Sequence, residues 1–217
     1  MRLVKKFSIY ISTTLLLLIV SAWLFRELYN RAEEKKQKSV IYHLSEEEKN
    51  QIRDGDIILR YGHGLVSDYI VNIFKEDYRI SHCGVVNKQG DSLYVIHSES
   101  SSVLSTEGIQ SQVFDEFTDA GQLNSVIIVR YNKADLQKLP EISRRAQYYL
   151  EKKIPFDYSF DTKDTAEMYC SEIIWHIFLD VFEDDIFTNP KGQQNFKQFK
   201  NFWDSSQFDI ILNHQQP

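Results

Sequence analysis

Cysteine, glycine and proline are all scarce in this sequence. Its 217 residues include only two Cys, eight Gly and four Pro. Two cysteines exclude a disulfide-dense small domain and a Cys-rich zinc module. So few Gly and Pro exclude a collagen-like or low-complexity chain. With 42% hydrophobic and 26% charged residues, the composition is instead that of a globular protein with a single core.

Most of the chain also lacks excess basic charge. Residues 1–38 carry a net charge of +5, whereas the remainder carries −11. An acidic domain without clustered Lys and Arg is unsuited to the phosphate backbone, so we expect no nucleic-acid partner. The motifs GxGxxG, GxxxxGK[ST] and GxSxG are absent as well. We therefore expect no cofactor and look for a nucleophile other than serine.

One long apolar run is present near the N-terminus. Phe7–Phe25 contains 19 residues without a charge and follows two lysines. A helix of this length rises about 28 Å, close to the thickness of the hydrocarbon layer. A signal anchor is favoured over a cleaved signal peptide, because the apolar run continues past the small residues 20–22 where cleavage would occur. A buried core helix is the remaining alternative.

The run also divides the chain. We expect a signal anchor or signal peptide in residues 1–25, a polar, helix-prone linker in residues 26–45 and one globular domain in residues 46–217. Either export interpretation places that domain outside the cytosol.

Periodicity within the domain predicts strands first and a long helix late. Alternating apolar residues predict the strands, and spacings of three and four residues predict the helices. The expected strands are 56–60, 81–87, 93–99, 126–131 and, more weakly, 208–212; the expected helices are 65–74, one around 142–150 and one beginning at Tyr169–Cys170. This order predicts an α+β fold in which an antiparallel sheet packs against helices.

Cys170 is the first candidate for chemistry, because it lies where the clearest helix begins. A thiol at a helix start faces unpaired backbone N–H groups and the positive end of the helix, which favour the thiolate and can stabilise an oxyanion. The alternative is that Cys170 is a small buried apolar residue, the commoner fate of a free cysteine.

Two histidines lie on the arms of a predicted hairpin. His82 and His97 can approach each other across neighbouring strands, while Cys83 points to the opposite face and is expected to pack in the core. Glu99 shares a strand face with His97, and the spacing between them predicts that only one contacts a given ring nitrogen of His82. A zinc site formed by the two histidines and Cys170 lacks short ligand spacing, so we expect no metal.

Several short segments together resemble one family. The chain resembles the YiiX-like permuted papain-fold amidases, relatives of NlpC-type peptidases and of lecithin:retinol acyltransferase, over about residues 50–185. The matching segments are Asp54–Ile58, Ser81–Val86, Val95–His97, Phe156–Tyr158 and Tyr169–Glu172. The resemblance implies a circularly permuted papain-like fold, in which the histidine strands precede the cysteine helix.

The resemblance also implies roles for individual residues. Cys170 matches the nucleophile, His82 the general base and His97 the third catalytic position. Many relatives carry a carboxylate at that third position, so Glu99 is the reserve orienting residue.

Two further residues match the family without an assigned role. Tyr169 and Glu172 are candidates for the substrate pocket, although Glu172 can instead cap the helix.

The resulting hypothesis is an exported thiol hydrolase that cleaves an amide or ester bond, acting on a cell-wall peptide or an amidated substrate. One alternative is a lipid acyltransferase or acyl hydrolase. Four aromatic residues of the tail suit a lipid surface, although their other explanation is core packing; they are Phe196, Phe199, Phe202 and Trp203. Another is a non-catalytic binding module. The expected partners are a small-molecule, peptide or lipid substrate and a membrane, with the domain on the periplasmic or other extracytoplasmic side of a bacterial membrane.

Overall fold

The computed structural model describes residues 2–37, 42–101, 106–160, 162, 165–187 and 198–215. The helices are α1 (Arg2–Gln37), α2 (Glu46–Lys49), α3 (Leu65–Phe74), α4 (Phe114–Asp119), α5 (Pro140–Lys152) and α6 (Cys170–Phe182), with the 3₁₀ turns η1 (Leu136–Lys138) and η2 (Phe199–Trp203). The strands are β1 (Ile57–Arg60), β2 (His82–Gln89), β3 (Ser92–Glu99), β4 (Gly108–Val113), β5 (Ile127–Tyr131) and β6 (Phe208–Asn213).

The six strands form one sheet in the order β4-β3-β2-β1-β5-β6. Every neighbouring pair is antiparallel. The predicted α+β class with an antiparallel sheet is therefore confirmed, and each predicted strand and helix appears within a few residues of its expected bounds.

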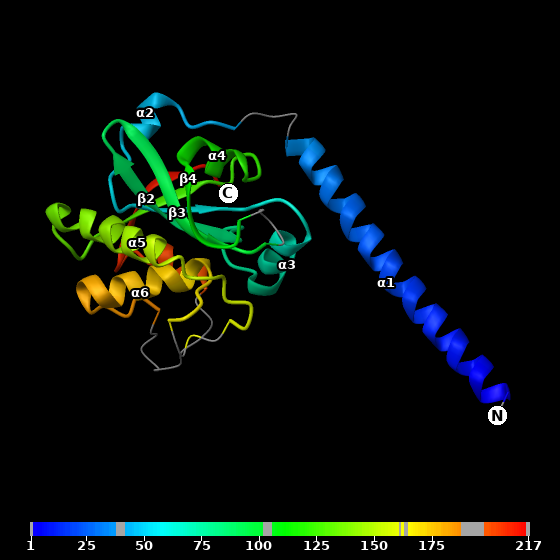
Figure 1. The fold of residues 1–217 in the computed structure, drawn as a ribbon. Coiled ribbons are helices and arrows are strands. Elements are labelled where there is room, and N and C mark those ends of the chain that lie inside the picture. The colour runs from blue at the N-terminus through cyan, green and yellow to red at the C-terminus, as the bar shows by residue number, and fades with distance from the viewer. Residues whose placement is uncertain are drawn as a thin grey trace.

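Helices cover the two faces of this sheet unequally (Figure 1). Helices α5 and α6 pack on one face, where Ile173 and Ile177 meet buried strand residues such as Leu59. On the other face the short helix α4 contributes Phe114 and Phe117 to a second, smaller core. Because strand side chains alternate, each strand residue belongs to only one of these two cores.

The short helix α2, the two 3₁₀ turns, strand β4 and helix α4 were not predicted, and the last two contribute residues to the site. Strand β4 reads GIQSQV and is half exposed at the edge of the sheet, so its polar residues hide the alternation that identifies a strand. Helix α4 has six residues, too few to show a helical period. The residues that these elements bring to the site were therefore missed.

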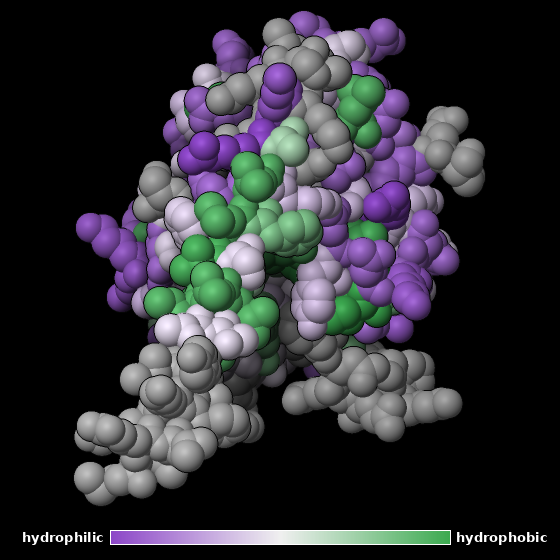
Figure 2. Space-filling view, turned by 90° about the vertical axis from the view of Figure 1, so that its right-hand side faces the viewer, coloured by the Kyte–Doolittle hydropathy of each residue, from purple (hydrophilic) through white to green (hydrophobic). Residues whose placement is uncertain are grey.

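Helix α1 projects away from the domain and contains the predicted apolar run (Figure 1). Its segment Ser12–Ala32 is long and apolar enough to cross a membrane, and none of it is buried. Figure 2 views the molecule from this side and shows apolar side chains gathered in one patch. The α1 helix meets the domain at α3, where the Tyr29 hydroxyl donates a hydrogen bond to Asp68.

The tail aromatics contribute to the core. Phe199 and Phe202 are buried, and Trp203 packs against the same cluster. These three side chains thus take the core-packing alternative, whereas Phe196 lies outside the described residues.

Candidate active site

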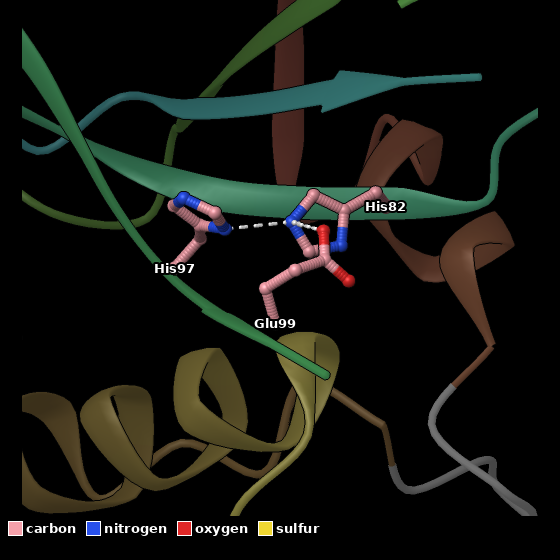
Figure 3. A group of neighbouring side chains, drawn as sticks. All are labelled: His82, His97 and Glu99. Carbon is pink, nitrogen blue, oxygen red and sulfur yellow. Dashed lines mark hydrogen bonds and ion pairs between the residues drawn. The ribbon is translucent and has the colours of Figure 1, made fainter. Parts of the chain in front are cut away.

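The β2–β3 hairpin brings the two predicted histidines together. His82 Nε2 and His97 Nδ1 are 2.8 Å apart and hydrogen-bonded, with the two rings edge to face (Figure 3). Gly84 makes room for this arrangement, because a Cβ at that position would lie 2.5 Å from a Val95 methyl and 3.0 Å from the His97 Cβ. The predicted contact between the two rings is confirmed.

Glu99 reaches the same ring nitrogen from the end of β3. Its Oε2 lies 3.3 Å from His82 Nε2 (Figure 3), so His97 and Glu99 converge on one atom. The prediction that only one of them would contact a given nitrogen is wrong. Spacing along a strand fixes the backbone positions, but the flexible Glu99 side chain extends back along the strand and closes the gap.

A buried arginine beside this trio was not predicted. Arg60 pairs with His82 across β1 and β2, and its Nη2 lies 3.7 Å from Glu99 Oε2. Its Nη1 donates a 2.6 Å hydrogen bond to the Phe117 carbonyl, and the guanidinium lies 4.2 Å above the Phe117 ring. The one sign of Arg60 in the sequence is its pattern: a charged residue alternates with apolar positions in β1.

Burial sets the charge states of this cluster. It lowers the pKa of His82 well below the ordinary value, with the Arg60 and His97 charges adding to the effect. Burial likewise lowers the pKa of His97 to about 3, so both rings are neutral at physiological pH. Burial raises the pKa of Glu99, while the Arg60 charge opposes that rise. Desolvation lowers the pKa of Arg60 itself to about 10.

Gln112 lies beside the cluster on the edge strand β4. It is diagonally across from His97, since β3 and β4 pair Val95 with Gln112 and His97 with Gln110. Its amide raises the pKa of His97, against the larger lowering by burial. Among the described residues, His97 Nε2 and Gln112 Oε1 are both buried without a hydrogen-bond partner. Gln112 is therefore a neighbour of the ring without a formed hydrogen bond to it.

The two cysteines share the opposite face of the sheet. Cys170 is the first residue of α6, and it packs against the core that holds Cys83, a β2 residue with 0% exposure. Burial, together with the neighbouring Cys170, raises the pKa of Cys83 well above its ordinary value. The predicted core packing of Cys83 is confirmed.

Cys170 packs against the core on one face of the sheet, whereas the rings of His82 and His97 lie against Phe117 on the other face. In the part of the chain that the structure describes, no hydrogen bond joins Cys170 to His82 or His97. Its charge does interact with Arg60 and raises the pKa of that residue against the effect of burial. Because Arg60 is the cross-strand neighbour of His82, the three residues share one end of the sheet. The roles of Cys170, His82, His97 and Glu99 remain predictions.

The two residues beside Cys170 support the start of its helix. Glu172 Oε2 accepts a 3.2 Å hydrogen bond from the Tyr169 backbone N–H, which is the capping alternative that the sequence left open. Tyr169 is 1% exposed and Glu172 is 0% exposed. Their place in a substrate pocket remains a prediction, whereas their place in the helix start is observed.

The trio has the donor set of a metal centre. His82, His97 and Glu99 each offer one ligand atom, and these atoms lie within 4.8 Å of one another. Two histidines and one glutamate suit zinc and related divalent ions. The Arg60 guanidinium, 3.7 Å from the same carboxylate oxygen, opposes a cation there. These residues fit a metal better than the set of His82, His97 and Cys170 considered from the sequence.

The architecture defines a class. An antiparallel sheet that carries paired histidines on one hairpin, followed later in the chain by a helix that begins with cysteine, is a papain-like core in permuted order. The chain belongs to the family of permuted papain-like amidase enzymes of the YaeF/YiiX type, the C92 peptidase family, whose profile matches residues 51–210. Membership in this family supports a cysteine-hydrolase-like activity.

A solved structure shows the same fold. The crystal structure of metalloprotein yiiX from Escherichia coli O157:H7 matches with a TM-score of 0.59 and 17% sequence identity, over 75% of this chain and 98% of that chain. The comparison with curated proteins finds no match.

Proposed function

We propose that the protein is a cysteine amidase that is exported and held at a membrane by α1. In this proposal the Cys170 sulfur attacks the carbonyl carbon of an amide or ester, forms a thioester and releases the amine or alcohol; water then releases the acid. His82 accepts the thiol proton and delivers it to the leaving group. The observation that carries the proposal is the buried hydrogen bond between His97 and His82, in a family of amidases.

The hydrogen bond to His97 leaves one nitrogen of His82 for the thiol. In this proposal His82 Nε2 donates the proton between the two rings to His97 Nδ1. The neutral His82 ring then presents Nδ1 as its basic atom. Apo structures often hold a nucleophile and its base further apart than the reactive complex does. The proposal therefore requires the start of α6 and His82 to approach each other in the reactive complex.

His97 and Glu99 have separate tasks in this scheme. His97 holds the neutral ring of His82 in the correct tautomer. Once His82 gains the proton, its pKa, strongly lowered by burial and by Arg60, makes the imidazolium costly. Glu99 Oε2, 3.3 Å from Nε2, then offers the compensating negative charge.

The substrate class follows from the family and from α1. We propose a cell-wall peptide or an amidated small molecule, met on the outer side of a membrane. An acyl lipid is the alternative substrate, because the same thioester step serves both.

Trapping the acyl intermediate tests this function. The full chain in detergent is mixed with peptide amide, acyl ester and phospholipid substrates, quenched in acid and analysed by intact mass. An acyl adduct on Cys170 is expected, its mass identifies the donor, and Cys170→Ala forms none. Unchanged turnover by Cys170→Ala would overturn the proposal. Cys83→Ala is the matched cysteine control and keeps the adduct.

A second candidate is a metal-dependent hydrolase. The convergence of His82, His97 and Glu99 favours it, and the structurally similar yiiX is described as a metalloprotein. These three residues would hold the ion, which would supply Lewis-acid chemistry or a more acidic bound water. The two candidates exclude each other, because His82 bound through Nε2 keeps its proton on Nδ1 and cannot accept one from Cys170.

Metal analysis distinguishes the candidates. The purified chain is dialysed against zinc, then against chelator, and its metal content and turnover are measured. The cysteine amidase retains turnover after chelation. One bound metal per chain, lost in His97→Ala and required for turnover, would instead support the metal-dependent candidate.

A further inference from the structure

Helix α3 presents a stripe of apolar side chains to solvent. Val66, Tyr69 and Ile73 are 46%, 66% and 53% exposed. With 3.6 residues per turn, these three positions fall within about 60° of one another and form one face of the helix. On the opposite face, Ile70 and Phe74 pack against the larger core. The rotation of α3 is therefore fixed, and it turns this α3 stripe outward.

Hydrogen bonds join α3 to the long helix α1 (Figure 1). The hydroxyls of Tyr29 on α1 and of Tyr61 both donate to the Asp68 carboxylate on α3. The N-cap residue of α3 also approaches α1, because a Cβ on Gly64 would lie 3.0 Å from Asn30 Oδ1. The one acidic side chain of α3 is thus paired within the protein, and α3 is held against residues 29–30 of α1.

This junction lies just past the apolar run of α1. The run Phe7–Phe25 ends four residues before Tyr29, which is about 6 Å along the helix axis. The headgroup layer extends roughly 5–7 Å beyond the hydrocarbon on each side of a bilayer, and tyrosine is common at that level. With the run of α1 across the hydrocarbon, the junction with α3 therefore lies at the headgroup level.

We propose that the α3 stripe is a second membrane contact, through which the globular domain docks on the lipid surface beside α1. Val66, Tyr69 and Ile73 enter the boundary between headgroups and acyl chains, where amphipathic helices bury their apolar faces by about 5–10 Å. The inference rests on the anchoring role proposed above for α1. The continuity of the stripe with the apolar surface of α1 favours lipid over a protein partner as its occupant.

Docking through α3 also positions the polar cluster. Only residues 61–64 separate α3 from Arg60, the last residue of β1. Within that connection, the Gly62 backbone N–H donates a 2.9 Å hydrogen bond to the hydroxyl of Ser81, the residue before His82. The lipid contact thus holds the His82 end of the sheet close to the bilayer, where a substrate at the membrane surface reaches it.

Spin-label accessibility tests the proposal. The full chain with Cys170→Ala, whose remaining Cys83 is buried, receives either Tyr69→Cys or Ile73→Cys, a nitroxide label, and vesicles of phosphatidylethanolamine and phosphatidylglycerol. Power saturation then compares collisions with oxygen, which concentrates in lipid, and with a water-soluble nickel chelate. At both positions the ratio of oxygen to nickel collisions is expected to be several-fold higher than at a water-exposed site.

Two further labels serve as controls. Tyr148→Cys replaces an exposed aromatic residue of α5, a helix on the side of the domain away from α1 (Figure 1), and should be accessible to nickel. Leu18→Cys lies within the apolar run of α1 and should be accessible to oxygen. All four labelled positions are exposed, so the variants should retain the fold, which circular dichroism checks.

Two results at the α3 positions would overturn the proposal: nickel accessibility equal to that of Tyr148→Cys, or shielding from both reagents, which indicates that protein such as a second copy covers the stripe. If Leu18→Cys is accessible to oxygen in either case, the α1 anchor stands and only the α3 contact fails. A water-exposed Leu18→Cys would overturn the anchor and the α3 contact together. The acyl adduct on Cys170 tests the amidase chemistry separately.

Discussion

Two buried charge clusters lie at the two ends of β1, on the same face of the sheet, and they differ in how completely they are paired. At the first end, Asp56 accepts two 2.7 Å hydrogen bonds from Arg130 and a 2.8 Å bond from the Arg53 backbone N–H. Burial raises the pKa of Asp56, and Arg130 opposes that rise. Each carboxylate oxygen has a partner, so this cluster suits one fixed charge state.

The cluster at the other end is paired loosely. Arg60 is 3.7 Å from Glu99 and Glu99 is 3.3 Å from His82. Within the described residues, Arg60 Nε has no hydrogen-bond partner. A saturated pair resists any change of charge, whereas a loose cluster can accommodate a proton that arrives and leaves. The comparison indicates that the Asp56 end stabilises the fold and the His82 end performs chemistry.

Removal of His82 should produce the largest effect. His82→Ala is expected to lower kcat by about 10⁴-fold, the scale seen when a catalytic triad loses its geometry, while the melting temperature changes little. Steady-state kinetics and thermal unfolding measure the two quantities. His43→Ala, a change at an exposed histidine outside the cluster, is the matched control and should retain activity. Full activity in His82→Ala would contradict the Cys–His mechanism.

The opposite result is expected at the other end of β1. Arg130→Ala leaves the buried Asp56 charge unpaired, which should cost about 3–5 kcal/mol of unfolding free energy. Turnover per folded molecule should be unchanged. Denaturant unfolding and active-site titration measure these quantities. Arg144→Ala, which breaks an exposed pair with Glu141, should cost at most about 1 kcal/mol; equal costs for the two variants would contradict the comparison.

His97 and Glu99 should have smaller effects than His82, with different pH profiles. His97→Ala should leave measurable residual activity, because it removes the residue that orients His82 but keeps His82 itself as the base. His97→Gln should recover part of the loss. Glu99→Gln removes the negative charge that compensates protonated His82. It should therefore lower kcat, chiefly in the step in which His82 carries the proton, without changing KM. The pH dependence of kcat for the three variants checks this. An unchanged rate in His97→Ala beside an inactive Glu99→Gln would make Glu99 the orienting residue.

Gln112 should have the smallest effect of the four. Gln112→Leu removes the amide that raises the pKa of His97 and should lower kcat several-fold with KM unchanged, since it acts only through the next ring. Gln112→Glu keeps an acceptor and should recover most of the rate. Nitrogen-15 NMR of the histidine rings reports the tautomer directly. Identical ring spectra in the wild type and Gln112→Leu would show that Gln112 does not set it.

The hairpin was predictable because its geometry is local. The turn at Gly90 and the alternation along β2 and β3 were enough to bring His82 and His97 together. Arg60 was missed because β1 pairs with β2 across the intervening helix α3. Gln112 was missed because β4 has a weak strand pattern. The helix start at Cys170 was predicted from its apolar period.

The position of Cys170 relative to the core could not be predicted from strand alternation. Alternation assigned Cys83 to the core side of β2, but it does not tell which helix residue lies opposite. Packing of the whole α6 helix on the sheet brings Cys170 against the core that holds Cys83. For the same reason, the convergence of His97 and Glu99 on one nitrogen depends on side-chain reach, which strand spacing alone does not give.

The most direct test of the Cys170–His82 pair is the pH dependence of Cys170 alkylation in the wild type and in His82→Ala. The reduced full chain reacts with iodoacetamide from pH 5 to pH 9, and peptide mapping separates Cys170 from Cys83. We predict rapid labelling of Cys170 below pH 7 in the wild type, slower labelling in His82→Ala, and almost none at Cys83. Identical Cys170 profiles in the two proteins, or faster labelling of Cys83, would contradict a catalytic pair.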